Sequence, residues 1–392
     1  MRANLIVLLV IVFLVGIGIG DGRISTHLPW GNQLSSVNSN LPSTLDYSSI
    51  NQVYQALRDN YDGNLTQTEL LNGLKHGLAD APGDPYTEYF TPAEAKDFND
   101  ELNNSFSGIG ADLTENSSGD LEVISPIAGA PAAAAGLQAQ DVIAGINGVS
   151  TSGMSVDTAV DKIRGPAGSK VTLDIVRNNT QALTLTITRA NITAPSVMTK
   201  ILPGNIGYMS ISTFADDTSS LSQKAAQQFE TDHVKGIILD LRDNPGGLVN
   251  AAVDVSSLWL PQNDMILQEK RGSTVLQTYT AEGDDTLHGI PTVVLINGVS
   301  ASASEITTGA LHDNGAAYVI GQKSFGKGVV QQLINFSDGS QLKVTIAYWY
   351  RPNGQNINHK GITPDKTIQD SGEGLGLPSD PQLQAAEAYL TK

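Results

Sequence analysis

The sequence predicts a multidomain α/β protein: an α/β core with buried, mostly parallel strands, an inserted β-rich module and a small N-terminal helical subdomain. First, 392 residues exceed what one hydrophobic core usually organises. Second, fully apolar strands alternate with helices after residue 206, which is typical of a sheet buried on both faces. Third, residues 105–190 contain short alternating strands with glycine turns, and residues 45–103 carry apolar residues at helical spacing.

These patterns divide the chain into consecutive parts. Residues after position 22 are at first polar and turn-rich, as in a linker. The predicted parts are a membrane anchor or signal segment (1–22), a linker (23–45), the helical subdomain (46–104), the β-rich module (105–190), the core (191–372) and a helical tail (373–392).

The N-terminal segment indicates export. Arg2 precedes an apolar run over residues 5–20, which Asp21 closes. As a helix this run would span about 24 Å, slightly less than the roughly 30 Å of a bilayer core. A single-pass membrane anchor and a cleaved signal peptide both remain open. Either one places the rest of the chain outside the cytoplasm, anchored to the cell membrane or secreted.

Composition excludes several classes of function. The formal charge is −17 with a pI near 4.6, so no basic face is available to bind nucleic acid. The chain has no cysteine, which removes disulfides, thiolate metal sites and cysteine nucleophiles. No group of His, Asp and Glu has metal-ligand spacing, so we expect neither a metal nor a cofactor.

Three glycine- or serine-rich loops follow three of the buried strands. The strands are Ile237–Leu241, Val293–Ile296 and Ala317–Ile320. The loops comprise residues 243–247, 300–305 and 324–328. Loops at the carboxyl ends of strands in an open α/β sheet converge on one crevice, so we expect these three to form one site. Asp240 and Arg242, beside the first loop, are interpreted as structural.

Ser302 is the candidate nucleophile of this site. It begins an alanine-rich helical segment, where the N–H of Ala303 would be available as an oxyanion donor. Gly246 or Gly247 could supply a second backbone donor. The alternative is a plain helix cap, because Ser302 and Glu305 also form a capping-box pattern.

A serine nucleophile needs a base, and Lys327 fits better than any histidine. His312 adjoins Asp313, but it lies about 15 Å along the same predicted helix from Ser302. Lys327 lies between two glycines, and burial would lower its pKa enough for it to accept a proton. The predicted strand after it would place Gln331 on the same face, where it could orient the amine.

A phosphate-binding loop is a rival interpretation of the same residues. Gly321 to Lys327 fits G-x-x-x-x-G-K, but Gly328 stands where a magnesium-binding Ser or Thr is required. A strand pattern follows in place of a helix. Both departures argue against nucleotide binding.

Several of these segments resemble the carboxyl-terminal processing peptidases, a family also called tail-specific proteases, in the family's order. Residues 84–92 (DPYTEYFTP) are similar to its segment before a PDZ domain, and residues 107–111 (SGIGA) and 135–148 to PDZ motifs. Residues 240–247, 300–305, 325–331 and 361–365 are similar to its peptidase motifs. One departure is Gln140, where the PDZ pattern has glycine, which puts the local turn geometry in doubt.

The resemblance implies a role for each matching residue. Ser302 would be the nucleophile, Lys327 the base and Gln331 its orienting partner. Asp313 would be a structural acid. The oxyanion hole would use backbone N–H groups of Ala303, Gly246 and Gly247, and the PDZ loop would bind peptide through Gly108, Ile109, Gly110 and Ala111.

The expected function is therefore that of a serine endopeptidase that cleaves exported proteins near their C-termini. Its PDZ domain would recognise substrate tails, its N-terminal segment would contact the membrane, and a homodimer is an expected assembly. The alternative is a catalytically silent PDZ-type binding or scaffold protein.

Overall fold

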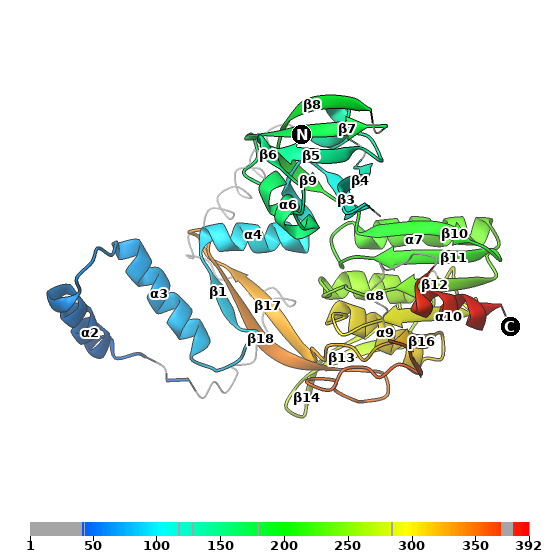
Figure 1. Ribbon diagram of the computed structural model, residues 1–392. Helices are drawn as coiled ribbons and strands as arrows, with labels where there is room; N and C mark the ends of the chain where they lie inside the picture. The colour runs from blue at the N-terminus through cyan, green and yellow to red at the C-terminus, as the bar shows by residue number, and fades with distance from the viewer. Residues whose placement is uncertain are drawn as a thin grey trace, which may run out of the picture. The chain divides into compact units, whose positions relative to one another are not determined.

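A computed structural model of the chain describes residues 41–391, except residues 43, 117, 128, 179, 284 and 370–378 (Figure 1). The chain divides into a unit that ends at Thr66 and a unit that begins at Gln67. In the first unit, α2 (Tyr47–Asn60) is capped by Asp46 and has no buried residue. The anchor or signal segment lies outside the described residues, and within those described no helix is long and apolar enough to cross a membrane.

The peptidase-like core is built on a six-stranded sheet in the second unit. Its strands, in spatial order, are β10 (Val197–Leu202), β11 (Ile206–Ile211), β12 (Gly236–Asp240), β15 (Thr292–Ile296), β16 (Tyr318–Gly321) and β19 (Lys366–Thr367). All neighbours run parallel except β10, which pairs antiparallel with β11. Every residue of β12 and β15 is buried, as the absence of a polar face in their sequences predicts.

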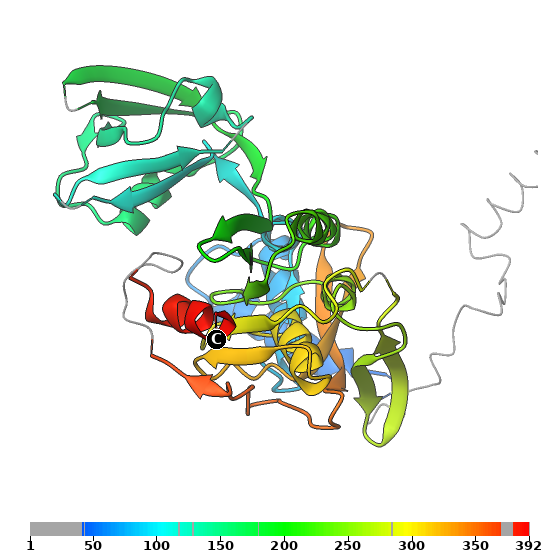
Figure 2. The same ribbon diagram turned by 90° about the vertical axis from the view of Figure 1, so that its right-hand side faces the viewer.

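Helices cover both faces of this sheet (Figure 2). Alternate residues of β12 enter different cores: Ile237 and Leu239 pack with one cluster, and Ile238 packs with another. The first cluster includes side chains of α7 (Thr218–Thr231), α8 (Val249–Ser257) and α9 (Ala303–Asp313). The second includes Leu383 and Ala386 of α10 (Pro381–Leu390). This two-sided burial explains why the strand lacks a polar face.

A second sheet lies beside the cavity described below, with the long strand β18 at its centre. It comprises β1 (Glu88–Phe90), β13 (Met265–Arg271), β14 (Thr274–Thr280), β17 (Val329–Asn335) and β18 (Gln341–Tyr350). The strand β1 differs from the sequence expectation, which assigned residues 46–104 to a helical subdomain. Besides α3 (Gln67–Asp80) and α4 (Pro92–Leu102), that stretch holds β1, because pairing with β18 buries Tyr89 and Phe90.

The inserted module follows α4 in the sequence and precedes the six-stranded sheet. It forms its own sheet and core. Its sheet contains β3 (Ala111–Glu115), β4 (Leu121–Pro126), β5 (Val142–Ile146), β6 (Val149–Ser150), β7 (Lys170–Arg177) and β8 (Gln181–Thr188). Helices α5 (Pro131–Ala134) and α6 (Val156–Ile163) complete the module, and the pair β2 (Ser105–Gly108) and β9 (Ala190–Thr193) joins it to the rest. Gln140, the departure from the PDZ pattern, has a φ of 67°, so a side chain occupies a left-handed position that favours glycine.

Candidate active site

The three loops predicted to converge do line one cavity, with a volume of about 490 Å³. They follow β12, β15 and β16, which are adjacent parallel strands, so their carboxyl ends lie at one edge of the sheet. The lining includes the predicted site residues Gly246, Gly247, Ser302, Lys327 and Gln331. Residues of α4 and of β17 form other parts of the wall.

The three serines of the second loop have different environments. Ser300 is fully buried, and its hydroxyl donates to the Leu241 carbonyl at 2.7 Å. Ser304 is also fully buried, and its hydroxyl donates to the Asn244 carbonyl at 3.0 Å. Ser302 is half-buried and lines the cavity. Of the three hydroxyls, that of Ser302 is therefore the one placed to meet a substrate.

The backbone at Ser302 is strained. Its φ of 52° and ψ of −114° lie outside the regions that side chains favour. The neighbouring loop approaches so closely that a Cβ on Gly246 would stand 2.7 Å from the Ser302 Cβ and 2.8 Å from the Ala301 carbonyl oxygen. Strain of this kind persists where the surroundings impose it, and here it aims a side chain into the cavity.

Glu305 is the group that imposes this geometry. Its carboxylate is fully buried and accepts hydrogen bonds from the Ser302, Gly326 and Lys327 N–H groups and from the Ser324 hydroxyl. Burial raises the pKa of Glu305, although all of these donors work in the opposite direction. One side chain thus ties the serine loop to the lysine loop. The sequence analysis identified Glu305 only as part of a capping-box pattern. A glutamate on an otherwise buried helix was the feature that could have indicated this role.

Lys327 lies in a loop that glycines allow to approach its neighbours. A Cβ on Gly326 would stand 2.8 Å from the Gly361 nitrogen, and one on Gly328 would stand 2.4 Å from the Asn358 nitrogen. Burial lowers the pKa of Lys327 and the charge of Lys343 lowers it further, while Asp84 and Glu305 oppose the shift. A lysine in this environment is more easily deprotonated than a solvated one.

Gln331 lies on the cavity wall two residues into β17. A register shift follows Val330, so that Gln331 pairs with Thr345 of β18. The Gln331 side chain donates from Nε2 to the Thr345 hydroxyl at 3.3 Å. Lys327 itself lies just before the strand and not within it.

The backbone donors near Ser302 are not equivalent. The Gly246 N–H donates to the Asn244 Oδ1 at 2.8 Å and is therefore occupied. Among the described residues, the N–H groups of Ala303 and Gly247 have no acceptor. Two backbone donors thus remain available beside Ser302.

The rival arrangements are not present in the structure. Helix α9 runs from Ala303 to Asp313 without interruption, so His312 lies in its last turn, where it contacts Asp313 and Asp365. Asp313 accepts from Arg351 Nε at 3.0 Å and does not line the cavity. The strand β17 and not a helix follows Lys327, and the described part of the chain contains no group of residues suited to a metal.

Asp240 and Arg242 form a buried network behind the first loop. Arg242 is fully buried, donates from Nε to Asp240 at 2.9 Å and pairs through Nη1 with Asp380 at 2.7 Å. Tyr208 donates its hydroxyl to Asp240 at 2.8 Å. Because Asp380 caps α10, this network connects the C-terminal helix to the loop that contains Gly246 and Gly247.

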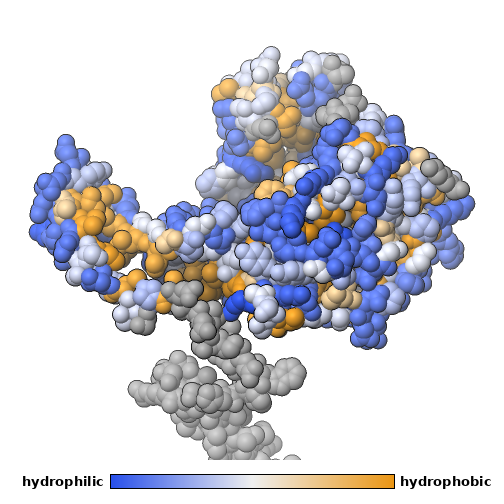
Figure 3. All heavy atoms as spheres, turned by 90° about the horizontal axis from the view of Figure 1, so that it is seen from below, coloured by the Kyte–Doolittle hydropathy of each residue, from blue (hydrophilic) through white to orange (hydrophobic). Residues whose placement is uncertain are grey.

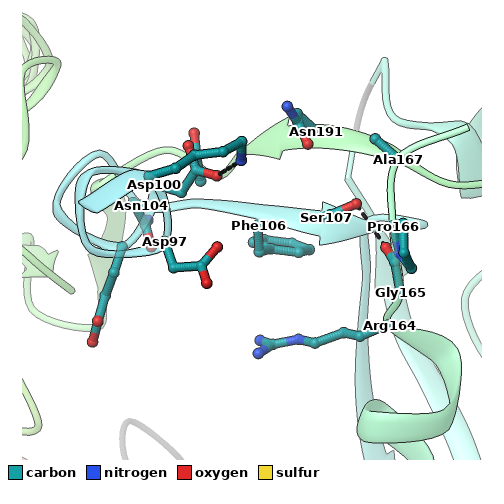
Figure 4. A pocket seen from close by; sticks show the side chains of 13 residues that line it. Asp97, Asp100, Asn104, Phe106, Ser107, Arg164, Gly165, Pro166, Ala167 and Asn191 are labelled. Carbon is teal, nitrogen blue, oxygen red and sulfur yellow. Dashed lines mark hydrogen bonds and ion pairs between the residues drawn. The ribbon is translucent and has the colours of Figure 1, made fainter. Parts of the chain in front are cut away.

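The loop of the inserted module that was expected to bind peptide has free donors. Among the described residues, the N–H groups of Ile109 and Gly110 have no acceptor. Arg164 follows α6, and its guanidinium carbon lies 5.5 Å from the centre of the Phe106 ring. Figure 4 shows Arg164 and Phe106 among the residues that line a cavity of about 950 Å³ next to this loop.

Comparisons with known proteins agree with this architecture. The model of peptidase family S41 matches residues 205–368, and the PDZ domain model matches residues 99–176. The chain is 36% identical over 363 residues to the carboxy-terminal processing protease CtpA of Bacillus subtilis, covering 88% of this chain and 78% of the relative. It is 35% identical over 360 residues to the carboxyl-terminal-processing protease of Synechocystis sp., covering 89% and 84%.

A solved structure of the photosystem II D1 C-terminal processing protease is also similar. Its TM-score is 0.51 at 27% identity, and the match covers 83% of this chain and 87% of that one. The predicted combination of an α/β peptidase with a PDZ domain is confirmed. This chain belongs to the carboxyl-terminal processing proteases of peptidase family S41 and is a serine-type peptidase.

Proposed function

We propose that the chain cleaves peptide bonds through an acyl-enzyme formed on Ser302, with Lys327 as general base and Gln331 as the residue that orients it. The observation that carries the proposal is the shared cavity. Ser302, the half-buried member of its serine group, and Lys327, whose pKa burial lowers, both line it. A neutral lysine amine next to a serine hydroxyl is an activated nucleophile of a known type.

The reaction follows from these positions. Lys327 Nζ takes the proton of the Ser302 hydroxyl as Oγ attacks the scissile carbonyl carbon. The resulting ammonium gives that proton to the leaving amine, and the carbonyl carbon remains as an ester on Ser302. A water then loses a proton to Lys327 and attacks the ester, which releases the acid and restores the serine.

The negative oxygen formed in each step needs backbone donors. We assign this role to the N–H groups of Ala303 and Gly247, which have no acceptor among the described residues. Gly246 was expected to contribute as well, but its N–H is occupied by Asn244. In this assignment Gly246 serves mainly to let the loop approach Ser302. Loss of one such donor typically costs about 100- to 1,000-fold in kcat.

The PDZ domain would capture the substrate tail. An extended C-terminal segment would add to the edge of β3, and its carboxylate would lie against the loop Gly108, Ile109, Gly110 and Ala111. Two free N–H groups of this loop and the nearby positive charge of Arg164 suit a carboxylate. A peptide with a free C-terminus should bind at least tenfold more tightly than its amide, and Arg164→Gln should reduce that preference.

The remaining expectations concern placement of the chain. We propose the domain boundaries given by the sequence, an extracytoplasmic location set by residues 1–22, and a homodimer. Helix α3 supports the dimer, because Leu71, Leu74 and Leu78 are 47%, 50% and 61% exposed. Figure 3 shows apolar side chains on this part of the surface. If no second copy covers these leucines, light scattering of the second unit would show a monomer.

The mechanism is tested with an unstructured protein substrate that ends in apolar residues. Ser302→Ala should lose at least 1,000-fold in kcat/KM while its melting temperature stays near that of the wild type. Ser304→Ala is the matched control, because it removes a buried hydroxyl from the same loop and should retain most of the activity. Full proteolysis by Ser302→Ala would overturn the assignment, and absence of proteolysis in the wild type would favour the scaffold alternative.

A further inference from the structure

The catalytic base has an unexplained neighbour, the segment of residues 84–87 that precedes β1. Glu88 of β1 pairs with Lys343 of β18, and two residues further along β18 Thr345 pairs with Gln331 of β17. The segment therefore reaches the edge of the cavity across β18. Its backbone register is fixed there, because the Thr345 N–H donates to the Thr87 hydroxyl at 3.2 Å.

Tyr86 of this segment contacts the catalytic lysine. The Lys327 Nζ lies 5.3 Å from the centre of the Tyr86 ring, within the range of a cation–π interaction. The charged groups that act on this ammonium are Asp84, Glu305 and Lys343. Among the described residues, the ammonium has no hydrogen-bond acceptor. Within the described residues, the Tyr86 ring is therefore the contact that confines this ammonium.

Asp84 is connected to Gln331, the proposed orienting partner of Lys327, through a short chain of hydrogen bonds. Its carboxylate accepts from the Tyr86 N–H at 3.1 Å and from the Thr87 hydroxyl at 2.6 Å. That Thr87 hydroxyl accepts from the Thr345 N–H at 3.2 Å, and the Thr345 side chain helps to lower the pKa of Asp84. The Thr345 hydroxyl oxygen in turn accepts a hydrogen bond from Gln331 Nε2 at 3.3 Å.

The donors and acceptors of this hydrogen-bond chain fit together in one order. An ionised carboxylate accepts hydrogen bonds only, so the Thr345 hydroxyl next to Asp84 would direct its proton toward that carboxylate. The Thr345 oxygen is then left as an acceptor, and Gln331 must present its NH₂ group to it. The amide oxygen of Gln331 consequently remains for the lysine. A neutral amine that keeps its lone pair for the Ser302 proton needs just such an acceptor for one of its N–H groups.

We propose that Asp84 is a positioning residue for the catalytic base: through Thr345 it fixes the amide orientation of Gln331, while Tyr86 of the same segment confines the Lys327 side chain. This inference rests on the proposed function of Ser302, Lys327 and Gln331. It makes the segment before the PDZ domain a working part of the peptidase site.

The test is steady-state kinetics on the full chain with the unstructured substrate. Thr345→Val keeps the shape of the side chain and removes the hydroxyl, so kcat should fall about 10- to 100-fold with little change in KM. Thr345→Ser should recover most of the loss, and Asp84→Ala should reproduce it. Thr278→Val is the matched control, because Thr278 accepts a similar bond from Gln268 Nε2 at 3.0 Å on β13 and β14, away from the cavity. Its kcat should not change.

A double-mutant cycle separates positioning from a structural effect. If Asp84 and Thr345 act through Gln331, then Thr345→Val should cost almost nothing in a Gln331→Ala background. Equal losses in both backgrounds, or a wild-type kcat for Thr345→Val, would overturn the inference. Retained activity in Ser302→Ala and Lys327→Ala would instead overturn the proposed function, so the two failures are distinguishable.

Discussion

The two halves of the proposed active site, around Ser302 as nucleophile and Lys327 as base, are held in different ways. On the nucleophile side, Ser302 has a strained backbone, its N–H is bound by buried Glu305, and Gly246 packs against its Cβ. On the base side, the Lys327 backbone is bound to Glu305, but within the described residues its ammonium contacts the Tyr86 ring and has no hydrogen-bond acceptor. The serine is therefore fixed by backbone geometry, whereas the lysine depends on side chains from several elements.

The largest effect should come from the base side. Lys327→Met should lower kcat/KM at least 1,000-fold without lowering stability. Burial lowers the pKa of Lys327 in the folded protein, so the charged amine opposes folding. This cost is fully present below the folded pKa and vanishes as pH rises through the unfolded value near 10.5. Chemical denaturation at pH 7 checks this, and a large loss of stability would show that the lysine is structural.

Glu305→Gln tests the fixed half. The donors around Glu305 now share two carboxylate oxygens, but a glutamine amide offers only one acceptor oxygen. Its NH₂ group would then face an N–H or a hydroxyl. We expect a loss of about 2–4 kcal/mol in the free energy of unfolding and roughly 100-fold in kcat. Urea denaturation and steady-state kinetics measure the two effects. Unchanged kinetics would mean that Glu305 does not hold Ser302 in its working position.

Asp380→Asn tests the buried network that supports the loop next to Ser302. It removes one charge from the ion pair with the fully buried Arg242, which leads directly into the loop of Gly246 and Gly247. Breaking a buried pair of this kind costs about 3 kcal/mol, and we expect a loss of activity of about tenfold or less. Thermal melting and kcat report the two. Asp365→Asn, at the exposed His312 contact, is the control and should change melting little.

The smallest effect concerns the pH profile. The proposed mechanism requires neutral Lys327, so activity should rise with pH through the lysine pKa, which burial and Lys343 place below 10.5. The Tyr86 ring stabilises the ammonium, so Tyr86→Leu should lower this pKa further and move the limb of log kcat/KM to lower pH. Tyr86→Phe keeps the ring and should leave the limb in place. A shift to higher pH in Tyr86→Leu would contradict this role of the ring.

Much of the architecture was readable from the sequence because burial leaves a strong pattern. The strands without a polar face predicted the sheet, and the strand order places the loops of Ser302 and Lys327 at one edge. These features depend on local periodicity and on general rules of α/β topology.

The missed features depend on contacts between distant segments. The strand β1 has three residues, too few for a periodic signal, and it exists because β18 buries Tyr89 and Phe90. The roles of Glu305 and Asp84 were not visible for a similar reason. The hydrogen-bond partners of Glu305 lie up to 22 positions away, and Asp84 is linked to β18 through Thr87, which accepts from the Thr345 N–H. The occupied N–H of Gly246 likewise depends on a local turn through Asn244.

The central claim is that Ser302 is the nucleophile that Lys327 activates. The most direct test is an acylating serine probe, such as a fluorophosphonate, followed by digestion and peptide mapping by mass spectrometry. The account predicts modification of Ser302 in the wild-type protein and almost none in Lys327→Met. Modification of Ser300 or Ser304, or undiminished modification of Ser302 in Lys327→Met, would contradict it.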